Sequence, residues 1–96
     1  MRDEAWAHHE QKNYRQAEIL YRKLIKDVPY DCDIANLGAL LRSEGRIKEA
    51  IANYKYWWKD FSGSKDLALN AVNAAIESKE LGLAEEWIKT AIRKNE

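Results

Sequence analysis

Residues 31–64 read DCDIANLGALLRSEGRIKEAIANYKYWWKDFSGS, and this stretch decides the fold. Its apolar residues recur at the spacing of helices that bury one face, first from Ile34 to Leu41 and then from Ile47 to Trp58. Gly45 lies between these segments, where the first helix must end. The stretch therefore predicts a helical hairpin. A lone hairpin cannot bury both of its apolar faces, so similar units are expected to stack on it.

The pattern of the second helix recurs on both sides of this stretch. An alanine followed four residues later by a large apolar residue occurs three times, at intervals of 33 and 34 residues: Ala17 with Tyr21, Ala50 with Tyr54, and Ala84 with Ile88. A fixed interval of this length indicates a repeat protein, in which each unit buries the apolar face of its neighbour.

These units resemble the tetratricopeptide repeat, whose signature is W-x2-L-G-x2-Y, then A-x3-F and a proline, with a period of 34 residues. The middle unit matches best, and its matching residues are Ile34, Leu37, Gly38, Leu41, Ala50 and Tyr54. The outer units match in part, through Ala17, Tyr21 and Pro29 in the first and through Ala84, Ile88 and Ala91 in the third. The middle unit is also similar to the repeats of O-linked N-acetylglucosamine transferases.

The resemblance implies an all-α fold of three stacked helix-turn-helix repeats that form a short right-handed superhelix, an α-solenoid. We expect one domain over residues 1–96. Its first repeat, residues 1–30, lacks its start, and the second and third repeats cover 31–64 and 65–96.

Composition narrows the classes of partner. The chain has 16 basic and 16 acidic residues, so its formal net charge is zero and electrostatics give no reason to expect nucleic acid as a partner. No apolar run is long enough to span a membrane, and the polar start MRDEA does not resemble a signal peptide. The single cysteine excludes an internal disulfide. We therefore expect a cytoplasmic protein that contacts neither nucleic acid nor membrane.

No pattern in the sequence resembles an active site. His8 and His9 are adjacent, so on a helix they point about 100° apart and do not share a metal ion. Cys32 has no second cysteine to pair with and no neighbour that would activate it. We expect no enzymatic activity, no metal site and no cofactor.

The repeat resemblance implies a binding surface, because the first helices of such units line the concave face on which extended peptides lie. Asn36 precedes Leu37-Gly38, Asn70 occurs 34 residues later, and a side-chain amide can both donate to and accept from a peptide group. The expected peptide path is Asn36, Arg42, Asn70 and Asn73, with Trp6, His9, Leu69 and Glu77 at its margins. The alternative is that Asn36 and Asn70 bond only within their own helix pairs.

Two functions follow from this interpretation. The first is a non-enzymatic module that binds a protein or peptide partner in its concave groove. The second is a structural spacer or oligomerisation segment of a larger protein, such as a glycosyltransferase that contains these repeats. The last helix bears on the second: Ala84, Ile88 and Ala91 are expected to pack inward, leaving Trp87 and Ile92 exposed for docking or homodimer formation.

Overall fold

The computed structural model describes residues 1–95, and all regular secondary structure among them is α-helical. The expected all-α class is therefore confirmed, while Glu96, the last residue of the predicted third unit, lies outside the described residues. The helices are α1 (Arg2–Glu10), α2 (Tyr14–Asp27), α3 (Asp31–Ser43), α4 (Ile47–Phe61), α5 (Lys65–Glu77) and α6 (Leu81–Lys94). No helix within residues 1–95 has the length and apolar character needed to cross a membrane.

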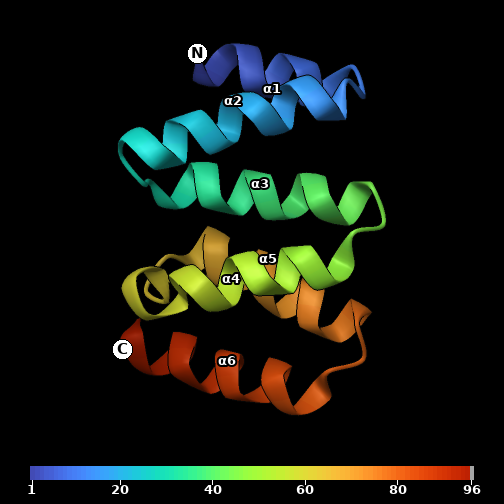
Figure 1. The fold of residues 1–96 in the computed structure, drawn as a ribbon. Coiled ribbons are helices and arrows are strands. Elements are labelled where there is room, and N and C mark those ends of the chain that lie inside the picture. The colour runs from blue at the N-terminus through green and yellow to red at the C-terminus, as the bar shows by residue number, and fades with distance from the viewer. Residues whose placement is uncertain (96) are drawn as a thin grey trace.

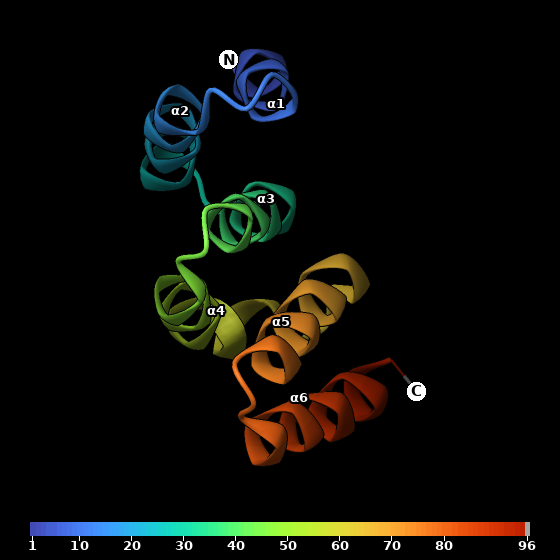
Figure 2. The same ribbon diagram turned by 90° about the vertical axis from the view of Figure 1, so that its right-hand side faces the viewer.

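Consecutive helices form three pairs, α1–α2, α3–α4 and α5–α6, which follow one another along the molecule (Figure 1). Helix α2 packs on α3, and α5 packs on both α3 and α4. In the view of Figure 2, α1, α3 and α5 lie on one side of the molecule, and α2 and α4 lie on the other. We call the side formed by α1, α3 and α5 the odd-helix face.

The turn inside each pair has the same backbone geometry. The residue that follows the end of the first helix has a positive φ in all three turns: 63° at Lys12, 77° at Gly45 and 65° at Lys79. The next amide N–H donates to the carbonyl five residues earlier, from Asn13 to His8, from Arg46 to Leu41 and from Glu80 to Ala75, at 2.8–2.9 Å. This Schellman motif recurs at the interval of the sequence pattern and ends the first helix at Gly45, as predicted.

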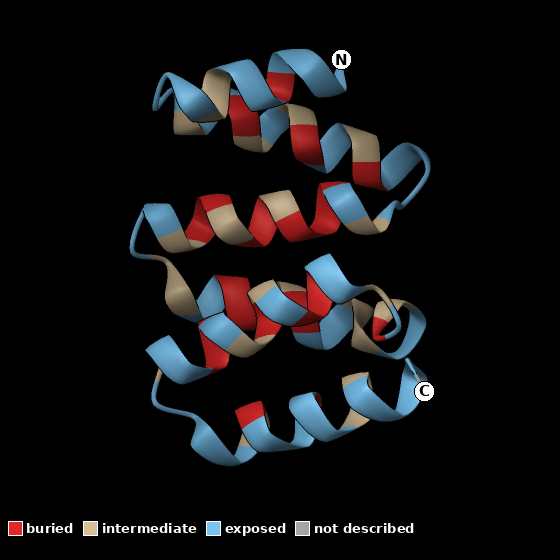
Figure 3. Ribbon diagram, turned by 180° about the vertical axis from the view of Figure 1, so that it is seen from behind, coloured by how far each residue is buried: buried red, intermediate tan, exposed pale blue. Residues whose placement is uncertain are grey.

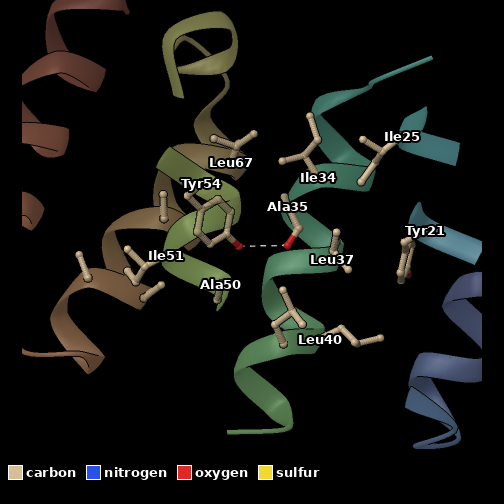
Figure 4. Close-up of a cluster of buried hydrophobic side chains, with 14 of the residues drawn as sticks. Tyr21, Ile25, Ile34, Ala35, Leu37, Leu40, Ala50, Ile51, Tyr54 and Leu67 are labelled. Atoms are coloured by element: carbon tan, nitrogen blue, oxygen red, sulfur yellow. Dashed lines mark hydrogen bonds between the residues drawn. The ribbon is translucent and has the colours of Figure 1, made fainter. Parts of the chain in front are cut away.

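The core of the middle pair depends on a close approach between α3 and α4. The buried Tyr54 hydroxyl donates to the backbone carbonyl of Ala35 at 3.1 Å, as Figure 4 shows. Gly38 makes room for this ring, because a Cβ at residue 38 would lie 2.7 Å from Tyr54 Cε2 and closer still to Cζ and Oη. Burial raises the pKa of the Tyr54 phenol, since the charged form would have to lose its water.

The first pair has the same tyrosine but not the same contact. Tyr21 is fully buried, and its hydroxyl has no hydrogen-bond partner within residues 1–95. Ala5, which is 33 residues before Gly38, carries the Cβ that Gly38 lacks. Burial raises the pKa of Tyr21 to about 12, with smaller contributions from Asp33 and Cys32. The tyrosine position is therefore retained where its backbone hydrogen bond is not.

The last pair contains the one clear error of the sequence analysis. Trp87 was expected to be exposed, but only 3% of it is accessible, because its ring stacks on Trp58 of α4 with 4.9 Å between the ring centroids. With Trp87 turned inward, Ile88 faces outward and is 42% exposed. The expected exposure of Ile92 is confirmed at 59%. In Figure 3, most of α6 is accordingly drawn as exposed.

Candidate functional site

The centre of the odd-helix face is Asn36 on α3. Its side chain is half-buried, and within residues 1–95 its amide forms no hydrogen bond. Asn70 on α5 differs, because its Nδ2 donates to the carbonyl of Asp66 in the same helix at 2.8 Å. The alternative interpretation, a bond within the helix pair, therefore describes Asn70 and not Asn36. Asn36 is left with a donor and an acceptor for a ligand.

Arg42 and Glu77 were predicted to lie near one path, and the structure brings them into contact. Arg42 Nε on α3 donates to Glu77 Oε2 on α5 at 2.8 Å. Both side chains remain accessible to solvent, so the pair contributes little to stability and can exchange partners. A charged pair of this kind offers both a donor and an acceptor to a peptide backbone. Asn73, also predicted, is exposed on α5.

Trp6 and His9 form an aromatic cluster at the other end of the face. The Trp6 ring meets His9 edge-on, with centroids 5.2 Å apart, and His9 in turn meets Tyr21 at 6.4 Å. Trp6 is nevertheless exposed. Burial lowers the pKa of His9, and Glu10 opposes this shift. An exposed indole beside a neutral histidine provides an apolar contact for a ligand side chain.

Leu69 lies in a different environment from the other predicted residues. It is exposed on α5 and lines a shallow groove of about 420 Å³ together with Val72, Ile88 and Ile92. Ala68 and Ala91 complete the floor of this α5–α6 groove, and Lys65 and Asn95 lie at its edge. The structure thus groups Leu69 with α6.

Two features were missed in the sequence. Arg2 binds the fully buried Asp33 through two hydrogen bonds, from Nε at 2.8 Å and from Nη2 at 2.7 Å, and its guanidinium lies over the Tyr30 ring. Asp33 raises the pKa of Arg2 through these bonds. The signal was present, because Asp33 is four residues before Leu37 and so shares its buried stripe.

The second missed feature is a groove of about 460 Å³ between α2 and α4. It is lined by Arg22, Ile25, Lys26, Pro29, Leu37, Asn53, Tyr56 and Trp57. Its residues come from three helices and are widely separated along the chain, so no local pattern could have revealed it.

Metal and thiol chemistry have little to work with in this part of the chain. Among residues 1–95, no group of three or more histidine, cysteine, aspartate or glutamate side chains is arranged to hold a metal ion. Cys32 is an exposed free thiol. Comparisons with protein-family models, with curated proteins and with solved structures found no match to this chain.

Proposed function

We propose that this chain is a tetratricopeptide-like module that binds an extended peptide on its odd-helix face and catalyses no reaction. Three observations support the repeat assignment: the 33- and 34-residue intervals, the same turn in every helix pair, and the Tyr54–Gly38 contact where the repeat signature has its glycine. In this proposal the pairs form a short right-handed superhelix whose concave side is the odd-helix face.

The observation that carries the binding proposal is the free amide of Asn36 at the centre of that face. A peptide group that passes Asn36 can both accept from its Nδ2 and donate to its Oδ1, whatever the ligand sequence. The Trp6–His9 cluster would contact an apolar side chain at one end. The Arg42–Glu77 pair would bond to polar groups at the other. Recognition would therefore combine sequence-independent backbone bonds with one apolar contact.

A displayed library of random peptides, selected against the wild-type chain, tests this proposal. We expect selected peptides whose affinity for the Asn36→Ala variant falls about tenfold, which is the loss expected for hydrogen bonds at a partly buried site. Asn70→Ala should have a smaller effect, because the Asn70 donor already bonds to Asp66. The melting temperature of both variants should stay close to that of the wild type.

Asn13→Ala is the matched control, because Asn13 is an exposed asparagine in the turn between α1 and α2. Its peptide affinity should equal that of the wild type. Selected peptides that bind Asn36→Ala and the wild type equally would contradict the proposed site.

The alternative function is that of a spacer or assembly segment of a larger protein, such as a glycosyltransferase. The exposed leucine and isoleucine side chains of the last helix pair favour it. For either function we propose a cytoplasmic location, because an exposed single thiol such as that of Cys32 is compatible with a reducing compartment.

A further inference from the structure

Exposed leucine and isoleucine side chains are concentrated at one end of the molecule. Among residues 1–95 there are six of them, and five belong to α5 or α6: Leu69, Ile76, Leu81, Ile88 and Ile92. The sixth, Ile19, is on α2. On α5, Leu69 and Ile76 are two turns apart on one side of the helix, and on α6, Ile88 and Ile92 are one turn apart. Together they form an apolar strip along the α5–α6 groove, which is unusual for a surface of a monomer.

The middle pair shows what normally happens to these positions. Residues 34 positions before Leu69, Val72 and Ile88 are Ala35, Gly38 and Tyr54, and all three are buried. Helix α5 packs on both helices of that pair. In the last pair, no helix within residues 1–95 covers the corresponding positions (Figure 2). The α5–α6 groove is therefore shaped like a surface that receives a helix.

The charges of α6 indicate which helix fits. Its first half carries Glu85 and Glu86, and its second half carries Lys89, Arg93 and Lys94. Two such helices side by side in opposite directions place the acidic half of each against the basic half of the other. The formal net charge of the chain is zero, so two copies do not repel each other overall.

We propose that two copies of this chain associate through the α5–α6 groove, with their α6 helices antiparallel about a two-fold axis. In this dimer Ile88 and Ile92 of each copy pack on the groove of the other. Glu85 and Glu86 pair with Arg93 and Lys94 across the axis. The same surface is used twice, so the association closes at two copies.

A head-to-tail stack is disfavoured by the other end of the molecule. In Figure 4, Leu37 and Leu40 of α3 point toward α2 of the preceding pair. The residues 33 positions earlier, which would make this contact if α1 covered the α5–α6 groove of another copy, are Glu4 and Ala7, and both are exposed. Such a stack would bury the Glu4 carboxylate against aliphatic side chains without a partner.

Sedimentation equilibrium over a range of low to high micromolar concentrations tests the dimer. The wild type should shift from one to two copies and go no further. Ile88→Lys should raise the dissociation constant at least about tenfold, because it places a charge in the apolar contact. Ile19→Lys is the matched control, since Ile19 and Ile88 are both 42% exposed, and it should dimerise as the wild type does.

A charge exchange tests the antiparallel arrangement. The variants Glu85→Lys/Glu86→Lys and Arg93→Glu/Lys94→Glu should each remain monomeric, because each places like charges across the axis. Their equimolar mixture should form a heterodimer. Circular dichroism of each variant should show that α6 remains helical.

Three results would overturn the proposal. A wild type that stays monomeric at high micromolar concentration would exclude the dimer. Equal dimerisation of Ile88→Lys and the wild type would place the interface elsewhere. Growth beyond two copies would exclude the two-fold arrangement.

Discussion

The first and the middle helix pairs place a tyrosine at the same position, yet the two hydroxyl groups are in different states. Tyr54 crosses Gly38 and donates to the carbonyl of Ala35. Tyr21, beside an α1 that has Ala5 at the corresponding position, is equally buried but has no hydrogen-bond partner within residues 1–95. One methyl group therefore separates a satisfied phenol from an unsatisfied one.

The turns of the same two pairs differ in residue but not in geometry. Lys12 and Gly45 both have a positive φ, and the Schellman hydrogen bonds around them are the same. A lysine can adopt this conformation at a cost of about 1–2 kcal/mol. The comparison teaches that the turn tolerates the loss of its glycine, whereas the helix crossing loses a hydrogen bond with it.

Gly38→Ala should have the largest effect. The new Cβ overlaps the Tyr54 phenol, which costs about 1–3 kcal/mol by overpacking, and the Tyr54 hydrogen bond, worth about 1 kcal/mol, is also lost. The higher helix propensity of alanine offsets about 1 kcal/mol, so we expect a net loss of about 2 kcal/mol in the free energy of unfolding, measured with urea. Adding Tyr54→Phe should recover part of this loss, because it removes an overlapping atom. A Gly38→Ala variant as stable as the wild type would contradict the account of this crossing.

The two tyrosines should respond differently to loss of the hydroxyl. Tyr54→Phe should lower the free energy of unfolding by about 0.5–1.5 kcal/mol, because it removes a hydrogen bond to the backbone. Tyr21→Phe should be neutral or slightly stabilising, because the hydroxyl it removes is buried without a partner. Equal losses in the two variants would show that Tyr21 has a partner in solution.

The turns should show smaller effects of opposite sign. Gly45→Ala should lower the free energy of unfolding by about 1 kcal/mol, because alanine is disfavoured at positive φ. Lys12→Gly and Lys79→Gly should each raise it by about 0.5 kcal/mol, since glycine relieves the same strain but gives the unfolded chain more freedom. Lysine-to-glycine variants that are less stable than the wild type would mean that these turns are not strained.

The smallest expected effect concerns His9, which occupies in the first pair the place of Arg42 in the middle pair. Burial holds the pKa of His9 below its ordinary value of 6.5, so the fold favours the neutral ring. This contribution is fully present above the unfolded pKa and is lost as the pH falls through the lower folded pKa. The melting temperature should therefore decrease slightly between about pH 7 and about pH 5.5, and His9→Gln should reduce this slope. An unchanged slope in the variant would assign the effect to other groups.

Much of the fold was accessible from the sequence because its signals are local. Apolar spacing located the helices, Gly45 marked a turn, and Ser64 was recognised as the cap of α5, where its Oγ accepts from the Leu67 amide at 3.3 Å. These features depend on residues within one or two turns of each other.

The orientation of α6 was not accessible in the same way. Its apolar stripe is wide enough for either Trp87 or Ile88 to face inward, and helical spacing alone does not decide between them. Trp58, which is 29 residues away, decides it by stacking on Trp87. The α5–α6 groove was missed for the same reason, because it exists only once Ile88 faces outward.

The central claim is that peptides bind the odd-helix face and leave the α5–α6 groove free. Its most direct test is an amide and indole chemical-shift map of the labelled chain, recorded with and without a selected peptide. We predict that the largest changes occur at Asn36, at Arg42 and at the indole of Trp6, while Ile88 and Ile92 stay unchanged. The largest changes at Ile88 and Ile92, with Asn36 unaffected, would contradict the account.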